Sequence, residues 1–249
     1  MTGGVMLVTG ASRGIGAAIA RRAAQAGYDV AVNYAGRADK AAEVVDDVEK
    51  LGRRAVAIQA DTADAQAVEA MFSETDHALG PVTALINNAG IVEKMTTSEV
   101  DAARLRRMID VNIMGYFLCA HHAVRRMGHS FGGRGGTIVN ISSRAAASGG
   151  LPGSIGYAAT KGAVDSMTLG QAKELGPEGI RAVAIRPGLI HSDIHDQNGG
   201  REGVDKMAQT SVPLGRGGEP DEIAGLAVWL CGDEATYVSG ALFDVGGGR

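Results

Sequence analysis

Seven short apolar runs, rich in β-branched residues, recur along the 249-residue chain and constrain its fold more than any other feature. They are VMLVTG, DVAVNY, RAVAIQAD, VTALINNAG, GTIVNISS, IRAVAIRPG and GALFDVGG, and segments with helical periodicity separate most of them. This alternation predicts parallel strands with crossover helices on both faces of one sheet. Several runs are apolar throughout, which is typical of strands buried on both sides. We therefore expect one α/β domain over residues 1–249, a Rossmann-type, doubly wound parallel sheet of about seven strands.

The composition and charge of the chain limit which binding partners and which cellular compartment are expected. The formal net charge is -4 and no basic run occurs, so neither a nucleic acid nor a membrane surface is expected as a partner, because both reward clustered Lys and Arg. The chain has no apolar stretch of membrane-spanning length, and its first apolar run begins too close to Met1 for a signal peptide. We expect a cytoplasmic protein that acts on a small molecule. Cys119 and Cys231 lie far apart without CxxC spacing, which argues against a disulfide framework or a zinc cluster.

The stretch TGASRGIG sets Gly10, Gly14 and Gly16 between the first apolar run and an alanine-rich segment with helical periodicity. Glycines let the chain turn sharply and let a ligand approach the backbone closely. If a helix begins near Gly14, its free N–H groups and the positive end of its dipole face the turn and suit a phosphate. A simple tight connection would also satisfy this pattern, so the surrounding residues have to decide between the two interpretations.

Ligands of doubly wound sheets lie beyond the carboxyl ends of the strands. The residues that follow the apolar runs are rich in glycines, amides and hydroxyls, and they are Gly10 to Gly16, Asn33 to Arg37, Asp61 and Thr62, Asn87 to Gly90, Ser142 and Ser143, and Pro187 to His191. We interpret this set as a cofactor cleft. The long irregular segment from about residue 191 to 218 follows it and is expected to form a substrate lid, with His191, His195, Gln197 and Arg201 as polar candidates for substrate contact.

Tyr157 and Lys161 stand four residues apart in YAATK and would share one face of a helix. A lysine ammonium favours a nearby phenolate and so lowers the phenol pKa from its usual value of about 10. That makes the phenol a usable proton donor and acceptor. Ser142 or Ser143, at the end of TIVNISS, would supply a hydroxyl to the same cleft. Neither serine stands in a GxSxG elbow, so we interpret them as hydrogen-bond donors rather than nucleophiles.

Five motifs in register resemble the short-chain dehydrogenase/reductase family over essentially the whole chain: TGASRGIG at 9–16, NNAG at 87–90, Asn112 in DVNIMG, ISS before YAATK, and RPG at 186–188. The resemblance implies hydride transfer between a nicotinamide and a carbonyl or secondary alcohol. Its catalytic tetrad would be Asn112, Ser143, Tyr157 and Lys161. Tyr157 would exchange the proton, Ser143 would orient the carbonyl, Lys161 would bind the nicotinamide ribose, and Asn112 would hold a water linking Lys161 to solvent.

The resemblance also implies a set of cofactor-binding residues, with the glycine turn on the pyrophosphate and Asp61 near the adenine. They are Gly10, Ser12, Arg13, Gly14, Ile15, Gly16, Asn33, Tyr34, Arg37, Asp61, Thr62, Asn88, Ala89, Gly90, Tyr157, Lys161, Pro187, Gly188, Ile190 and Ser192. Asn33 at the end of the second apolar run, with Arg13 and Arg37 nearby, favours NADP over NAD, because two cations suit a 2′-phosphate. No metal site is expected, since His191 and His195 lack further well-placed ligands.

Several points stay open from the sequence. The interval from Ser143 to Tyr157 is one residue longer than in many family members, and the extra residue is expected in RAAASGGLPGSIG. Trp229 stands at a core-like spacing. Family members commonly pair the helices that carry Asn112 and Tyr157, so a homotetramer or dimer is expected. The alternatives are a sugar (glucose-type) dehydrogenase, a 3-oxoacyl thioester reductase, or a dinucleotide-binding sensor without catalysis.

Overall fold

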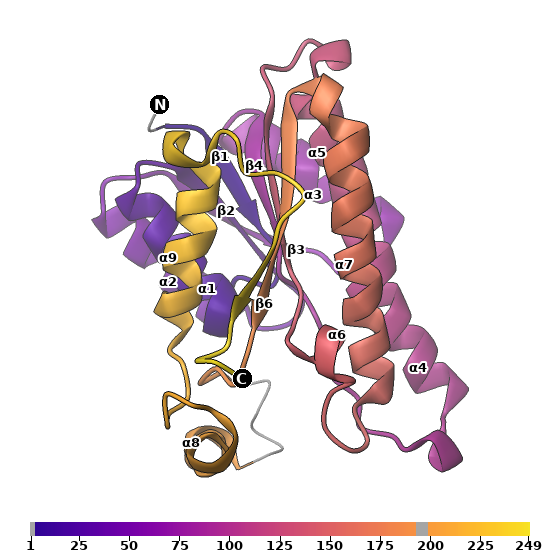
Figure 1. The fold of residues 1–249 in the computed structure, drawn as a ribbon. Coiled ribbons are helices and arrows are strands. Elements are labelled where there is room, and N and C mark those ends of the chain that lie inside the picture. Colours follow the sequence, from indigo (N-terminus) through magenta and orange to yellow (C-terminus); the bar gives the residue numbers. More distant parts are fainter. Residues whose placement is uncertain (1–2, 193–198) are drawn as a thin grey trace.

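A central parallel sheet of seven strands organises the computed structural model, which describes residues 3–192 and 199–249 (Figure 1). The strand order is β3-β2-β1-β4-β5-β6-β7. The strands are β1 (Val5–Val8), β2 (Asp29–Tyr34), β3 (Ala55–Gln59), β4 (Val82–Asn87), β5 (Gly136–Ile141), β6 (Ile180–Pro187) and β7 (Leu242–Val245). Each of the seven apolar runs forms one of these strands, so the predicted fold class is confirmed.

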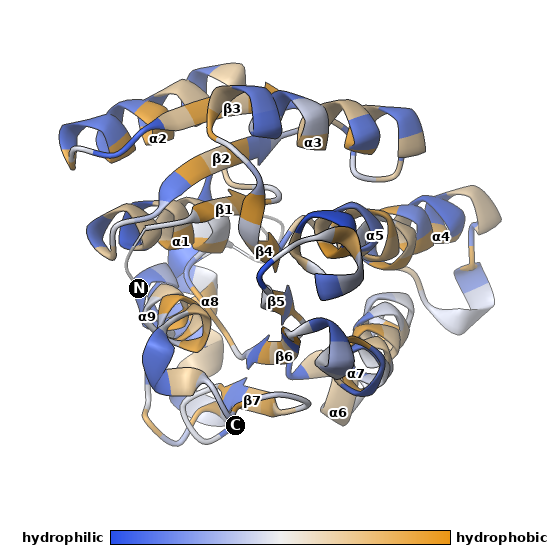
Figure 2. Cartoon of the chain, turned by 90° about the horizontal axis from the view of Figure 1, so that it is seen from above, coloured by the Kyte–Doolittle hydropathy of each residue, from blue (hydrophilic) through white to orange (hydrophobic). Residues whose placement is uncertain are grey.

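Helices cover both faces of the sheet (Figure 2). One face carries α1 (Gly14–Gln25), α2 (Ala38–Lys50) and α9 (Pro220–Cys231), and the other carries α3 (Ala65–Ala78), α4 (Ala102–Ile109), α5 (Gly115–Met127) and α7 (Ile155–Leu175). A π-helical turn, η2 (Asp110–Met114), joins α4 to α5. The remaining elements are helix α8 (Gly200–Ser211), the short helix α6 (Ala145–Ser148), and the 3-10 turns η1 (Thr97–Glu99), η3 (His129–Phe131), η4 (Gly176–Glu178) and η6 (Asp233–Ala235).

The two layers of helices enclose two apolar cores, one on each side of the sheet. Ile19, Val44 and Ile223 lie in the core beneath α1, α2 and α9. Phe72 and Cys119 lie in the core on the opposite face, beneath α3 and α5. Because both sides of the sheet are covered, most side chains of the inner strands β1, β2, β4, β5 and β6 are buried, which explains their uninterrupted apolar runs, whereas the edge strands β3 and β7 are mostly half-buried.

The strand order also determines where a ligand can bind. Strand β1 pairs with β2 on one side and with β4 on the other. The chain therefore winds outward in opposite directions from this point, and a crevice forms beyond the carboxyl ends of β1 and β4. The residues that follow these two strands are the glycine turn and the NNAG stretch.

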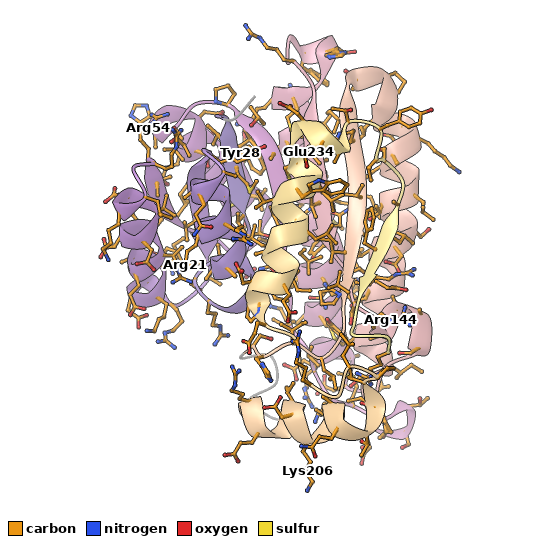
Figure 3. All side chains as sticks on the ribbon, turned by 60° about the vertical axis from the view of Figure 1, so that its left-hand side comes forward. Arg21, Tyr28, Arg54, Arg144, Lys206 and Glu234 are labelled. Atoms are coloured by element: carbon orange, nitrogen blue, oxygen red, sulfur yellow. The ribbon has the colours of Figure 1, made fainter. Side chains whose placement is uncertain are left out.

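The outer surface carries charged side chains such as Arg21, Arg54 and Lys206 (Figure 3), of which Arg21 pairs with Asp47 at 2.8 Å and Arg54 with Asp29 at 2.7 Å. Trp229 corrects a sequence expectation, since it is 40% exposed rather than packed in the core. Its indole nitrogen donates to the Glu234 carboxylate at 2.9 Å, and helix α9 buries other residues against the sheet. None of the helices in the described part of the chain combines the length and apolar character needed to cross a bilayer.

Candidate active site

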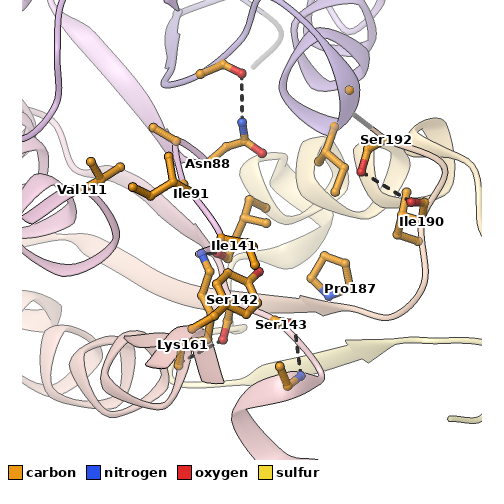
Figure 4. Close-up of a pocket in the computed structure, with 18 of the residues that line it drawn as sticks. Asn88, Ile91, Val111, Ile141, Ser142, Ser143, Lys161, Pro187, Ile190 and Ser192 are labelled. Atoms are coloured by element: carbon orange, nitrogen blue, oxygen red, sulfur yellow. Dashed lines mark hydrogen bonds between the residues drawn. The ribbon is translucent and has the colours of Figure 1, made fainter. Parts of the chain in front are cut away.

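A cavity of about 400 Å³ opens beyond the carboxyl ends of the strands (Figure 4). Most of the predicted site residues line it. They are Gly10, Ser12, Arg13, Gly14, Ile15, Asn33, Arg37, Asp61, Thr62, Asn88, Ala89, Gly90, Ser143, Tyr157, Lys161, Pro187, Gly188, Ile190 and Ser192. Among the described residues, the predicted Gly16, Tyr34 and Asn112 are not part of this lining, and each has a supporting position instead.

The glycine turn has the conformation that the sequence pattern requires. Gly10 and Gly14 have φ angles of +62° and +55°, which side chains rarely adopt. Helix α1 begins at Gly14, so its first N–H groups face the cavity. Gly16 lies behind the turn, where a Cβ atom would stand 2.5 Å from the Gly10 carbonyl oxygen and 2.6 Å from Asn88 Nδ2. This glycine therefore allows close packing rather than contact with a ligand.

Two side-chain amides, the buried Asn33 and the half-buried Asn88, hold the turn in place. The Asn33 carboxamide oxygen accepts a hydrogen bond from the Gly10 N–H at 3.1 Å, and its Nδ2 donates to the carbonyls of Ile58 at 3.3 Å and Ala60 at 3.0 Å. Asn88 Nδ2 donates to the Gly10 carbonyl at 3.1 Å from the opposite side. The hydrogen bonds of Asn33 are thus made within the protein, and its predicted role in cofactor binding stays a prediction.

Thr9, which the sequence reasoning passed over, connects the turn to the NNAG stretch. Its hydroxyl oxygen accepts hydrogen bonds from the backbone N–H groups of Asn88 at 2.9 Å and Ala89 at 3.0 Å, and it donates to the Ile86 carbonyl. Its place beside Gly10 in TGASRGIG is the signal that could have identified it. The two sides of the crevice are therefore fixed to each other through one side chain.

The end of the cavity near Asn33 and Asp61 carries more charged side chains than the sequence indicated. Arg13 and Arg37 both line it, and Arg37 donates two hydrogen bonds to the exposed carboxylate of Asp39, at 3.0 and 2.9 Å. Asp61 forms an ion pair with Arg107 at 2.8 Å. Arg107 is a lining residue that the sequence did not single out. Tyr34 is half-buried and packs against the core beneath α1 and α2.

Ser143, Tyr157 and Lys161 meet at the other end of the cavity. Ser143 stands on the loop after β5, hydrogen-bonds the Tyr157 side chain, and accepts from the Ala145 N–H at 3.1 Å. Ser142 is buried instead, with its hydroxyl donating to the Lys161 carbonyl at 3.2 Å. The preference for Ser143 over Ser142 agrees with this geometry.

The chain between Ser143 and Tyr157 follows a compact excursion. The chain forms the short helix α6 and then turns through Gly149, Gly150 and Gly153, whose φ angles are all near +80°. The Ser154 N–H bonds back to the Leu151 carbonyl at 2.8 Å before α7 begins. The serine and the tyrosine therefore still meet.

Lys161 is almost fully buried. Its Nζ donates to the Ile141 carbonyl at 2.8 Å and to the Tyr116 hydroxyl at 3.1 Å, and it lies 5.8 Å from the centroid of the Tyr157 ring. Tyr116 in turn donates to the same Ile141 carbonyl at 3.0 Å. The sequence reasoning missed Tyr116, although its spacing of four residues from Asn112 would have indicated a shared face.

Burial changes the proton affinities that the sequence suggested. It raises the pKa of Tyr157 to about 12, with the hydrogen bond from Ser143 acting in the opposite direction. It lowers the pKa of Lys161 to about 7, opposed by the charge of Asp165. We expected the lysine to lower the phenol pKa, but desolvation outweighs that effect here, since both groups lie in the low-dielectric interior. The phenol is therefore protonated at neutral pH.

Asn112 braces the site from the π-helical turn η2. Its carboxamide oxygen accepts from the Ile91 N–H at 2.9 Å, and its Nδ2 donates to the Ile91 carbonyl at 3.0 Å and to the Thr160 hydroxyl at 3.1 Å. It thus joins the loop after β4 to α7, one residue before Lys161. Single π-turns of this kind are frequent at functional sites. The water that Asn112 would hold stays a prediction.

The expected lid begins and ends at one point of the sheet edge. Ile190 and Gly218 form a parallel bridge, and the His191 N–H donates to the Gly218 carbonyl at 2.8 Å. The His191 ring lies between Asp205, at 2.7 Å, and Glu219, at 3.0 Å, so it fastens the lid and does not face the cavity. The predicted candidates His195 and Gln197 lie outside the described residues.

The other two lid candidates differ in position. Arg201 is exposed and pairs with Glu219 at 2.5 Å, away from the cavity. Ser192 does line the cavity, and its Cβ would lie 3.4 Å from a Cβ built on Gly14. The start of the lid therefore faces the glycine turn.

A parallel sheet with a glycine turn at its switch point, and a half-buried tyrosine with a buried lysine beside a serine hydroxyl, defines a nucleotide-binding oxidoreductase of the Rossmann type. A sequence profile described as Enoyl-(Acyl carrier protein) reductase matches residues 10–249. The chain is 43% identical to the Escherichia coli oxidoreductase YgfF over 98% of its own length and 99% of that protein. The chain belongs to the short-chain dehydrogenase/reductase family and is an oxidoreductase.

Two further relatives carry more specific names. The 3-oxoacyl-[acyl-carrier-protein] reductase FabG of Staphylococcus aureus is 40% identical, over 97% of this chain and 96% of that protein. A short-chain dehydrogenase from Burkholderia cenocepacia, solved in complex with NADP, superposes with a TM-score of 0.89 at 35% identity, covering 98% of this chain and 96% of that one.

Proposed function

We propose that this chain is an NADP-dependent oxidoreductase that reduces a carbonyl group, or oxidises the corresponding secondary alcohol, with Tyr157 as the general acid and base. The observation that carries this proposal is the convergence of Ser143, Tyr157 and Lys161 on one end of a cavity whose other end is the glycine turn. A dinucleotide that spans such a crevice places its nicotinamide at the end opposite its adenosine.

In the direction of reduction, the geometry assigns one step to each side chain. The Ser143 hydroxyl hydrogen-bonds and polarises the substrate carbonyl. Tyr157, whose raised pKa of about 12 keeps it protonated at neutral pH, donates its phenolic proton to the carbonyl oxygen. The charged form of Lys161 stabilises the phenolate that remains. The bound cofactor, when reduced, supplies the hydride to the carbonyl carbon.

Charge at the adenosine end supports NADP as the cofactor. Arg13 and Arg37 line this part of the cavity, and positions 33–37 contain no carboxylate that would repel a 2′-phosphate. The Burkholderia cenocepacia relative, solved with NADP, supports the same choice. A 2′-phosphate would compete with Asp39 for the Arg37 guanidinium.

The S. aureus relatives favour a 3-oxoacyl thioester as the first substrate class to test. A cofactor sensor without catalysis is less well supported, because Tyr157 and Lys161 are both present and both line the cavity. The enzyme hypothesis and the sensor hypothesis differ in whether the protein turns over any substrate.

The test follows NADPH and NADH absorbance at 340 nm over a panel of acyl thioesters, sugars, small ketones, diketones and quinones. Tyr157→Phe removes only the phenolic proton, so turnover should be lost while NADPH binding persists. Tyr237→Phe is the matched control, because Tyr237 is fully exposed. Turnover that survives in Tyr157→Phe would refute its role. Cofactor binding without turnover of any compound in the wild-type chain would favour the sensor.

We also propose a homo-oligomer formed through the face of α5 and α7. Met114 at the end of η2, Phe117 in α5 and Leu169 in α7 expose 50%, 51% and 41% of their surface, and a partner subunit on this face would cover that apolar area. Sedimentation equilibrium of the wild-type chain and of Phe117→Asp tests this, and a monomeric wild-type chain would refute it.

A further inference from the structure

Helix α7 carries a third ionisable residue, Asp165, on the face that bears the tyrosine and the lysine. Tyr157, Lys161 and Asp165 follow one another at intervals of four residues, so they lie on one side of the helix. Asp165 is 7% exposed, which is rare for a carboxylate. It does not line the cavity, and the reaction proposed above gives it no part.

The way Asp165 is held leaves half of its carboxylate unbonded. Arg186 donates from Nε at 3.0 Å and approaches with Nη2 at 2.8 Å, and both contacts are to Oδ2. The other oxygen, Oδ1, is buried and has no hydrogen-bond partner. A buried anion with an unsatisfied oxygen costs stability, so its presence calls for a functional explanation.

Arg186 is itself fixed by a chain of alternating charges. It lies 3.6 Å from Asp244 on β7, and Asp244 pairs with Arg144 at 2.5 Å. Arg144 directly follows Ser143 and lies beside β7 (Figure 3). The carboxylate of Asp165 is therefore held by contacts that reach β6, β7 and the loop carrying Ser143.

The groups around the Lys161 ammonium are otherwise neutral. Its neighbours are the Tyr116 hydroxyl from α5, the Ile141 carbonyl from β5 and the Tyr157 ring from α7. Burial raises the pKa of Tyr116 well above its usual value and that of the nearby Cys119 to about 12, so both stay uncharged at neutral pH. Burial lowers the pKa of Lys161 to about 7, and the charge of Asp165 opposes it.

We propose that Asp165 is a positioning residue whose carboxylate, fixed by Arg186, supplies the counter-charge that keeps Lys161 an ammonium ion in the buried site. The inference rests on the proposed function, in which the charged lysine stabilises the tyrosine phenolate. Asp165 touches neither the cavity nor the reacting atoms and acts through Lys161. Arg186 orients the carboxylate, although its own positive charge partly offsets the field at the lysine.

The direct test is the titration of the Lys161 ε-carbon by NMR in 13C-lysine-labelled protein, with the resonance assigned by Lys161→Arg. In Asp165→Asn, the midpoint should fall by about one pH unit, as expected for the loss of an opposite charge one helical turn away. Asp165→Glu keeps the charge and should restore most of the midpoint. Arg186→Gln removes a positive charge and should leave the midpoint unchanged or raise it.

Asp76→Asn is the matched control, because Asp76 forms a similar pair with Arg126, at 2.6 Å, on the α3 and α5 side of the molecule. A merely structural role for Asp165 would lower stability in both Asn variants and leave the lysine midpoint in place. An unchanged midpoint in folded Asp165→Asn overturns the proposal. If that variant does not fold, a downward shift in Arg186→Gln overturns it instead.

The consequence for catalysis follows from the same shift. At a pH well above the midpoint, a fall of one unit lowers the charged fraction of Lys161 about tenfold, so kcat of Asp165→Asn should drop about tenfold there and much less below the midpoint. An equal loss at every pH would contradict the electrostatic role. The NMR titration needs neither cofactor nor substrate, so failure of the proposed function and failure of this inference are separately visible.

Discussion

Replacing Asn33 by alanine tests whether this buried amide holds the glycine turn. The change removes three hydrogen bonds, at 3.1 Å from the Gly10 N–H and at 3.3 and 3.0 Å to the carbonyls of Ile58 and Ala60. Each contributes about 1 kcal/mol net, and Asn33 is only 2% exposed, so water does not readily replace them. We expect the free energy of unfolding to fall by about 2–4 kcal/mol.

The same variant should lose affinity for the cofactor, because the Gly10 amide is released from its position. A roughly tenfold rise in the NADPH Kd corresponds to about 1.4 kcal/mol. Urea denaturation and a fluorescence titration with NADPH measure the two effects.

Asn140→Ala is the control for the loss of a buried amide. Asn140 is also fully buried and also makes three hydrogen bonds: its Nδ2 donates to Thr168 Oγ1 at 2.9 Å and to Gln171 Oε1 at 3.0 Å, and its Oδ1 accepts from Asn87 Nδ2 at 3.0 Å. None of these three bonds is made to the glycine turn. It should lower stability and leave the Kd unchanged. The reasoning is refuted if Asn33→Ala loses less than about 1 kcal/mol, or if both variants weaken NADPH binding equally.

Three further outcomes follow from the structure. Arg13→Ala combined with Arg37→Ala should weaken NADPH binding and leave NADH binding nearly unchanged. The control Arg21→Ala, in α1 but outside the cavity lining, should change the binding of neither cofactor. Equal losses of NADPH and NADH binding in the double variant would contradict the assignment of these arginines to the 2′-phosphate. Lys161 has a pKa of about 7 in the folded chain, below its usual 10.5. Between these two pH values the unfolded chain binds more protons than the folded chain, so the free energy of unfolding should rise by roughly 1 kcal/mol for each pH unit. Urea midpoints between pH 7 and 8.5 should show that rise, and Lys161→Met should show a smaller one. Gly16→Ala should lower the free energy of unfolding by about 1–3 kcal/mol, because its Cβ would stand 2.5 Å from the Gly10 carbonyl oxygen. Gly170→Ala, which places its Cβ in open space on α7, should raise the free energy of unfolding by about 0.5–1 kcal/mol in the same assay.

Much of the architecture follows from local pattern. Apolar runs of four to eight residues that alternate with helical periodicity determine parallel strands and crossover helices, because only that arrangement buries both faces of such strands. The glycine turn and the strand ends then locate the crevice, since the topology brings the carboxyl ends of β1 and β4 together. The start of α3 also follows from local sequence. Asp64 precedes AQAVEAMF, a position typical of an N-cap residue, and its side chain caps α3.

Other properties depend on burial and on contacts between residues that are far apart in the chain, and a linear sequence pattern does not record either. Asn33 and Gly16 are both predicted to be cofactor-binding residues. In the structure Asn33 holds the glycine turn, and Gly16 leaves room for Asn88. His191 was a candidate for substrate contact and proves to be fastened between two carboxylates. These roles arise from partners that are remote in the chain.

The sequence by itself determined the fold, the place of the crevice and the residue types that meet there, because periodicity and glycine geometry act over short stretches of chain. Only the tertiary structure decided the charge states. The spacing of Tyr157 and Lys161 suggested a lowered phenol pKa, but burial raises it to about 12 and brings the lysine to about 7. Desolvation depends on everything packed around a group, and the opposing charge of Asp165 depends on where the fold holds its carboxylate, so both effects exist only once the chain has folded.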